Sequence, residues 1–427
     1  MSKRTLHDPY QALRFRNYRL LLIGNFISSM GEQMLTIAVG WELYERTNSA
    51  FLLGLVGLVE VTPVIILSLY AGHVADRYNR KLIIVITQVV LVLASLGLTA
   101  LSFWQGPLIL IYGCLLLIGI AGTFNNPAAS TIPAQLIPEE AFENAATWGS
   151  SAWQLASVIG PAIGGLVIAL MKSATFVYVL NTVAAFVFVI LLLFIKIKPF
   201  ALKDKPAAIE RATWHSLGEG ISFLRRTPIM LAAITLDLFA VLLGGATNLL
   251  PIFAKDILQV GPEGLGWLRA APAVGALCVA FFLAHRPPFK RAGRTLLLAV
   301  AGFGAATIIF GLSRSFWLSL LMLFVLGGLD NISVVIRETL SLLRTPDEMR
   351  GRVAAINGLF INSSNQLGGF ESGLTAQLFG PTLSVVGGGV GTMVVVLGVT
   401  LLWPELRRLT TLREIGPKAT ALEQNSL

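Results

Sequence analysis

Long apolar runs, each ended by charged or turn-forming residues, follow one another along the whole chain. A run of about 20 residues is long enough to cross the hydrocarbon core of a bilayer as a helix. Backbone polar groups in lipid must be satisfied within the protein, so these runs favour helices over open sheets. We count twelve candidate spans: 18–41, 51–74, 82–103, 107–127, 146–170, 174–195, 229–251, 263–284, 295–312, 316–337, 354–378 and 383–403.

The composition agrees with a chain whose solvent is lipid rather than water. Of the 427 residues, 55% are hydrophobic and 13% are charged, whereas soluble proteins are about 25% charged. The formal net charge of +9 does not indicate nucleic acid, because the cations cluster in loops between apolar runs, where topology determinants lie. We therefore expect an integral membrane protein that contacts the lipid bilayer and no nucleic acid.

The distribution of lysine and arginine predicts the orientation of the spans. If the N-terminus is cytoplasmic, the cytoplasmic segments contain 27 of the 32 Lys and Arg residues, and the opposite loops contain four. An excess of cations in cytoplasmic loops is the usual determinant of topology. We therefore predict an even number of spans in the cell inner (plasma) membrane, with both termini cytoplasmic.

An internal repeat divides the chain into two similar halves. A constant shift of 208 residues relates Gly119, Thr131, Pro138, Ala146, Gly160 and Gly165 to Gly327, Thr339, Pro346, Ala354, Gly368 and Gly373. Duplicated six-helix halves with a substrate site between them are a known transporter architecture. We therefore predict an all-α membrane fold of two pseudo-symmetric six-helix bundles. Its segments are an N-terminal segment (1–17), a first bundle (18–195), a linker (196–228), a second bundle (229–403) and a tail (404–427).

Ionisable residues inside the spans are costly in lipid, and each is a candidate functional group. Glu32 lies near the middle of the first span, and Asn25, Ser28 and Ser29 share its helical face. Such a polar stripe is able to line a cavity, in which a carboxylate binds and releases protons or contacts substrate. The alternative is that Glu32 bonds a neighbouring helix and serves packing alone.

Six further residues are candidates for the same proton-coupling or substrate cavity: Asp237, Asp330, Arg337, Arg269, Glu371 and Glu60. Asp237 comes within three residues of the position that the repeat makes equivalent to Glu32. Two carboxylates facing each other across the halves would suit a proton relay or a cationic substrate. A structural aspartate that bonds a helix backbone is the alternative interpretation.

The two arginines within the spans, Arg337 and Arg269, each have a carboxylate that could neutralise their charge. Asp330 and Arg337 are seven residues apart on one helical face, which allows an ion pair between them. Alternatively, Arg337 extends toward water at the end of its span. Arg269 either meets an anionic substrate or neutralises Glu371. In the fifth span, Trp148 and Trp153 either stack on an aromatic ligand or pack against neighbouring helices.

The sequence lacks the motifs of other energy sources and chemistries. No Gly-x-x-x-x-Gly-Lys-Ser/Thr loop occurs, so ATP is not the expected energy source. The four histidines and two cysteines are scattered, without the spacing of metal ligands. We therefore expect a monomer without cofactor, metal or enzyme activity, and a membrane receptor is the remote alternative.

A short charged loop joins the second and third spans. Gly72 is followed four residues later by Asp76 and Arg77, and then by Arg80. This spacing resembles the loop signature of the major facilitator superfamily. The resemblance implies that Asp76 pairs with Arg77 or Arg80 and holds the cytoplasmic side shut. Asn79 stands where the family usually has glycine, and the second half has no equivalent aspartate, so we expect this gate in one half only.

Two further regions extend the resemblance over essentially the whole chain. The fifth span contains Gly160-Pro161-Ala162-Ile163-Gly164-Gly165, which resembles the antiporter signature of drug-efflux members. Because proline bends helices and glycine lets backbones approach closely, tight packing is the alternative interpretation. In the second half, a resemblance to the bacterial branch with enterobactin-type siderophore exporters and macrolide efflux pumps is carried by segments 236–240, 249–254, 330–337 and 346–353.

The resemblance implies a secondary transporter that exports a small organic molecule, a siderophore or a drug such as a macrolide, in exchange for protons. Its two halves would rock about a site at the membrane midplane. In this hypothesis Glu32 carries the proton and Asp237 assists. An importer or facilitator of the same fold is the alternative.

Overall fold

The computed structural model describes residues 8–196, 222–286, 289–346 and 349–409. The predicted linker and C-terminal tail therefore lie largely outside the described residues. Contacts between Cα atoms divide the chain into two compact units, which are considered one at a time. Unit 1 contains the described parts of 1–38 and 66–209, and unit 2 those of 39–65 and 210–427.

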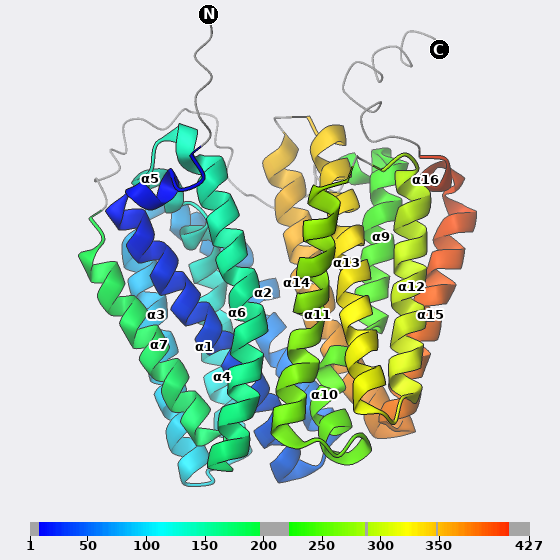
Figure 1. Cartoon of the computed structure of the whole chain (residues 1–427). Helices are drawn as coiled ribbons and strands as arrows, with labels where there is room; N and C mark the ends of the chain where they lie inside the picture. The colour runs from blue at the N-terminus through cyan, green and yellow to red at the C-terminus, as the bar shows by residue number, and fades with distance from the viewer. Residues whose placement is uncertain (1–7, 197–221, 287–288, 347–348, 410–427) are drawn as a thin grey trace, which may run out of the picture. The chain divides into compact units, whose positions relative to one another are not determined.

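Every regular element in the described ranges is a helix (Figure 1). The long helices are α1 (Arg16–Thr47), α2 (Ala50–Arg77), α3 (Arg80–Phe103), α4 (Leu108–Ala129), α6 (Phe142–Met171), α7 (Thr175–Phe194), α9 (Pro228–Leu243), α11 (Gly261–Ala284), α12 (Ala292–Leu312), α13 (Phe316–Arg344), α14 (Arg350–Phe379) and α15 (Pro381–Leu402). The short ones are η1 (Ala12–Arg14), α5 (Pro133–Leu136), η2 (Glu139–Ala141), η4 (Ala246–Leu249), α10 (Leu250–Ile252), η5 (Phe253–Ile257) and α16 (Pro404–Arg408).

By length and composition, 11 of the helical stretches in the described residues are able to cross a membrane. The long helix that does not reach this hydropathy is α14. It corresponds to the predicted eleventh span, and its 30 residues carry Asn362, Asn365, Gln366 and Glu371. Polar side chains lower its hydropathy without shortening the helix, so α14 is long enough to be the twelfth span.

The two units repeat one packing pattern. In unit 1, α3 packs against α4 and α7, and in unit 2, α12 packs against α13 and α15 (Figure 1). A shift of 208 residues carries the first three helices onto the second three. The repeat in the sequence is therefore a repeat of helix contacts as well.

The seventh span differs from the single helix predicted over 229–251. α9 ends at Leu243, and a 3-10 turn (η4), a short helix (α10) and a π-helix (η5) continue the chain to Ile257. Gly244 and Gly245 lie at the break. A Cβ at Gly244 would meet the Phe303 ring at 2.6 Å, and one at Gly245 would meet the main-chain O of Gly368 at 2.7 Å. The break thus brings bare backbone against α12 and α14.

Residues 39–65, which comprise the C-terminal end of α1 and the N-terminal part of α2, group with the second half of the chain in unit 2. Gly54 of α2 approaches Gly373 of α14 so closely that a Cβ on Gly54 would lie 2.9 Å from the Gly373 Cα. At the end of α1, the Tyr44 hydroxyl donates a hydrogen bond to Asp256. Nearby, the Lys255 ammonium donates to the side-chain oxygen of Asn48 at 2.8 Å.

Candidate functional site

A cavity of about 470 Å³ lies in unit 1, within the range of about 300–1,000 Å³ usual for small-molecule sites. Its walls come from α1, from the segment that follows α4, and from α6. Asn25 and Ser29 supply polar groups from α1, and Trp153 supplies an exposed ring from α6. This mixture of apolar walls and a few polar groups is typical of a ligand site.

Glu32 continues the polar face of α1 one turn beyond Ser29. Its side chain is exposed although it lies near the middle of the helix. The Ser28 hydroxyl donates a hydrogen bond to Glu32 Oε1 at 3.3 Å. Among the ion pairs found in the described residues, none involves Glu32. The carboxylate is therefore available to an incoming group.

The antiporter-like motif of α6 packs against α1. A Cβ at Gly160 would lie 2.7 Å from the Gln33 Cβ, and one at Gly164 would lie 3.1 Å from the Met34 Cα. Pro161 and Gly165 of the same motif are buried. The motif lets two backbones pack closely, and it does so beside the helix that carries Asn25 and Glu32.

The predicted gate residues lie where α2 ends and α3 begins. Asp76 and Arg80 form an ion pair at 4.0 Å, and Arg80 Nε also donates to the Ala75 carbonyl at 3.3 Å. Arg77 is the last residue of α2, and its side chain is exposed. A Cβ at Gly72 would meet nothing within 4 Å, so packing does not explain this glycine.

Asn79, the departure from the family signature, has a local structural role. Its side-chain oxygen accepts from the backbone N–H groups of Lys81 and Leu82, at 3.0 and 3.4 Å, and caps α3. Such a cap satisfies N–H groups that the helix itself leaves unbonded. Lys81 then donates to the Ile195 carbonyl at 2.7 Å, which ties the loop to the end of α7.

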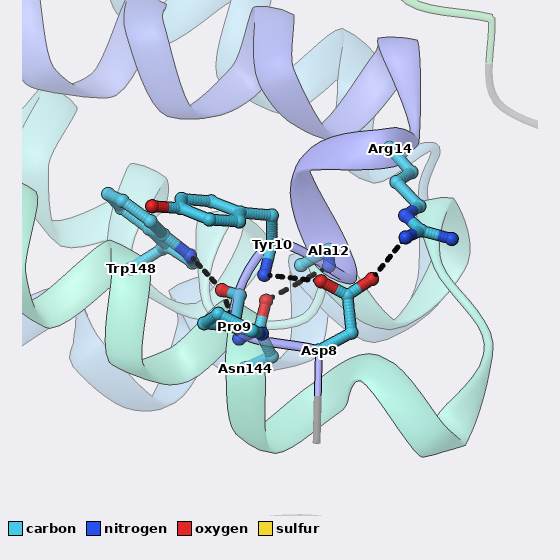
Figure 2. Close-up of polar contacts among 7 residues, drawn as sticks. All are labelled: Asp8, Pro9, Tyr10, Ala12, Arg14, Asn144 and Trp148. Carbon is cyan, nitrogen blue, oxygen red and sulfur yellow. Dashed lines mark hydrogen bonds and ion pairs between the residues drawn. The ribbon is translucent and has the colours of Figure 1, made fainter. Parts of the chain in front are cut away.

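The segment 8–15, which we call the N-terminal strap, lies across the start of α6 (Figure 2). Asn144 donates to the Pro9 carbonyl at 2.8 Å and accepts from the Ala12 N–H at 2.9 Å. The Trp148 indole donates to the same Pro9 carbonyl at 3.0 Å, and its ring faces Tyr10 with 6.0 Å between centroids. Trp148 thus packs against the strap rather than offering its face to a ligand.

Unit 2 contains a group of three charged residues that we call the charged cluster: Asp237 on α9, and Asp330 and Arg337 on α13. Asp237 and Arg337 form an ion pair in which both side chains are 8% exposed. Asp330 interacts electrostatically with both of them. The predicted ion pair joined Arg337 to Asp330, seven residues away on the same helix. The structure instead pairs Arg337 across to α9, because packed neighbouring helices bring side chains into closer contact than two turns of one helix.

A second polar group in unit 2 joins α2, α11 and α14. Gln366 donates to Glu60 Oε2 at 2.8 Å, and Glu60 interacts electrostatically with Arg269. Arg269 also donates to the Thr247 carbonyl at 3.1 Å. Glu371, the expected counter-charge of Arg269, accepts a hydrogen bond from Ser372 at 3.4 Å. Glu60 therefore takes the role that the sequence interpretation gave to Glu371.

Some residues of these groups carry no recognisable pattern in the sequence. Ser333 lies beside the charged cluster and is 2% exposed, but an isolated serine in an apolar helix predicts nothing. Asn144 is equally isolated, and its role depends on a distant segment folding back. Within the described residues, no group of three His, Cys, Asp or Glu side chains is arranged to hold a metal ion.

Comparisons with known proteins cover nearly the whole chain. A family model described as a transmembrane secretion effector matches residues 7–415. The enterobactin exporter EntS of Shigella boydii serotype 4 (strain Sb227) is 27% identical over 408 residues, which make up 95% of each chain. EntS of Escherichia coli O1:K1 / APEC is 26% identical over the same shares.

Solved structures give the same result for the fold. The nucleoside transporter NupG superposes with a TM-score of 0.70 at 14% identity, over 91% of this chain and 99% of that one. A bacterial homologue of the human lysosomal transporter Spinster, in an inward-facing and unoccupied conformation, gives a TM-score of 0.68 at 15% identity, over 94% and 98%. These likenesses confirm the predicted all-α membrane fold, and a count of twelve spans is consistent with them.

Proposed function

Because this chain belongs to the transmembrane secretion effector family of the major facilitator superfamily, we propose that it exports a small organic molecule by proton antiport. The helices and the exporter relatives make it a multi-pass protein of the inner membrane. A siderophore or a macrolide-like drug is the proposed cargo, and the relatives named enterobactin exporters favour the siderophore.

The cavity of unit 1 is the single observation that supports a substrate site most directly. It is large enough for an organic molecule, and Asn25, Ser29 and Trp153 offer hydrogen bonds and a flat ring. Glu32 stands one turn beyond it with an exposed carboxylate. We assign the recognition of polar or cationic parts of the cargo to Asn25 and Glu32.

Alternating access requires contacts that form at one end while the other end opens. Tyr44 with Asp256, and Lys255 with Asn48, join the ends of α1 and η5 in unit 2. With both termini cytoplasmic, these contacts lie at the outer side. We propose that they close the outer side, and that Asp76, Arg77 and Arg80 close the cytoplasmic side in the opposite state.

Transport of enterobactin tests the proposal. Inside-out membrane vesicles that contain the protein should take up enterobactin when their interior is acidified, and dissipation of the proton gradient should stop uptake. Vesicles with a variant in which the cavity is filled, Gly149→Trp, should take up less, because Gly149 lines the cavity. Proton-driven accumulation by whole cells instead would contradict export and support an importer.

A further inference from the structure

The charged cluster holds more negative than positive charge. Among the described residues, Arg337 forms an ion pair with Asp237, and Asp330 interacts electrostatically with both, so the cluster carries two negative charges and one positive charge. In a membrane protein an uncompensated buried charge is costly, and such residues usually belong to ion or proton pathways. Binding of one monovalent cation would make the cluster neutral.

A small cavity adjoins the two carboxylates. Asp237, Asp330 and Ser333 line it together with apolar residues of α9, α12 and α13, and its volume is about 10 Å³. That is close to the minimum for one water molecule. The Ser333 hydroxyl, on a side chain only 2% exposed, has no hydrogen-bond partner among the described residues. A buried hydroxyl without a partner indicates that a small polar species completes the site.

A second cavity of about 10 Å³ lies on the other side of the ion pair. Arg337, Ser341 and Asn357 are its polar lining residues, and its apolar ones come from α9 and from Leu340 of α13. Ser341 is one turn beyond Arg337 toward the C-terminal end of α13. Asp237 lines the first cavity and its ion-pair partner Arg337 lines the second, which is an arrangement that a gated proton path needs.

Among the described residues that line the two cavities, Asp237, Asp330 and Arg337 are the charged ones. Along the first cavity α12 contributes Val300 and Phe303, and along the second α14 contributes the neutral Asn357. Asp237 is the titratable group that α9 brings to these cavities. Of the two described carboxylates at the cavities, Asp330 is the one outside the ion pair.

We propose that Asp330 is the proton-binding residue of this transporter, with Arg337 as the switch that responds to it. This inference rests on the proposed proton antiport and places the coupling site in unit 2, apart from Glu32. A proton on a carboxyl oxygen of Asp330 leaves Arg337 paired with Asp237. When that proton leaves through the second cavity, Asp330 regains its charge and competes with Asp237 for Arg337.

Two measurements on reconstituted protein test the assignment. In the first, infrared difference spectra after a pH step report protonation of carboxyl groups without any substrate. The protein should show the band of a protonated carboxylic acid, Asp330→Asn should lose it, and Glu32→Gln should keep it. Glu338→Gln is the matched control, because it removes an exposed carboxylate from the same helix.

In the second measurement, proteoliposomes exchange enterobactin either by counterflow, which needs no gradient, or against a pH gradient. Asp330→Asn should keep counterflow and lose gradient-driven accumulation, and Glu338→Gln should keep both. Unchanged gradient-driven transport in Asp330→Asn would overturn the inference, and so would a drive by sodium in place of protons. Absence of counterflow in the unmodified protein would instead refute the proposed export of enterobactin, while the infrared result would still decide the proton site.

Discussion

The two halves of the chain hold their acidic groups in opposite environments. In unit 1, Glu32 is exposed, has one hydrogen bond from Ser28 and stands near a cavity of about 470 Å³. In unit 2, Asp237 is buried, forms an ion pair with Arg337 and borders a cavity of about 10 Å³. Glu32 thus stands near a cavity of organic-molecule size, whereas Asp237 borders a cavity of about the size of one water molecule.

The repeat relates none of these acidic residues to an acidic residue in the other half. Under the shift of 208 residues, Glu32 corresponds to Ala240, which lines the small cavity one turn from Asp237. Asp330 and Arg337 correspond to Gly122 and Ala129, so the first half has no equivalent of the charged cluster. The two proposed sites would thus divide the binding of cargo and the binding of a proton between the halves.

Removal of the Arg337 guanidinium in unit 2 should have the largest effect on stability. In Arg337→Ala, Asp237 stays buried without a counter-charge, which typically costs about 3–5 kcal/mol. We expect a corresponding loss in the free energy of unfolding, measured by detergent denaturation of the purified protein. The double variant with Asp237→Asn should recover most of it. A single variant as stable as the original would show that the pair is not buried as described.

A methyl group added at Gly160, in the glycine-rich motif of α6 that packs against α1, should have the next largest effect on stability. In Gly160→Ala, the new Cβ would lie 2.9 Å from the Met30 carbonyl oxygen, and such overpacking typically costs about 1–3 kcal/mol. Gly149→Ala in the same helix is the control, because a Cβ there meets nothing within 4 Å. Equal unfolding midpoints for the two variants would show that α6 and α1 do not pack closely at Gly160.

Loosening of the N-terminal strap should have a smaller and more local effect. Asn144→Ala removes two hydrogen bonds to the strap, each worth about 1 kcal/mol. Faster amide hydrogen exchange over residues 8–15 should report it, with exchange in α3 unchanged. Glu143→Ala, at the exposed neighbouring position, should leave the strap as it was. Unchanged exchange in Asn144→Ala would mean that other contacts hold the segment.

Neutralisation of the exposed Glu32 carboxylate should have the smallest effect on stability. Glu32→Gln keeps an oxygen that accepts from Ser28, and exposed substitutions usually change stability by less than about 0.5 kcal/mol. Its effect should appear in the concentration of substrate needed for half-maximal transport, with gradient coupling intact. Loss of coupling with counterflow retained would transfer the proton-carrier role to Glu32 and erase the division between the halves.

The long apolar runs and the internal repeat predict most of this fold, because lipid places strong limits on each segment separately. Helix bounds are predicted less well. The first span was expected over 18–41, but α1 extends to Thr47, because a helix continues past the hydrocarbon core on its own hydrogen bonds. The break after Leu243 depends on backbone contacts with α12 and α14, although the Gly244-Gly245 pair marks its place.

The sequence identified the members of the charged cluster but not which of them pair with each other. Charge within a span identified Asp237, Asp330 and Arg337, and helical spacing alone suggested the wrong partner for the arginine. Spacing describes one helix, whereas the observed pair joins α9 to α13. Trp148 was ambiguous for a similar reason, because its partner Pro9 lies 139 residues away in the chain.

The grouping of residues 39–65 with the second half has a consequence for cutting the gene in two. A fragment that begins after residue 221 would lack the stretch of α2 whose Gly54 fits against Gly373, and the Tyr44 partner of Asp256. Expressed alone, it would leave Gly373 of α14 without the α2 backbone that packs against it. Co-expressed with a fragment that contains residues 1–221, it should assemble with that fragment, because residues 39–65 of α1 and α2 would supply the missing contacts.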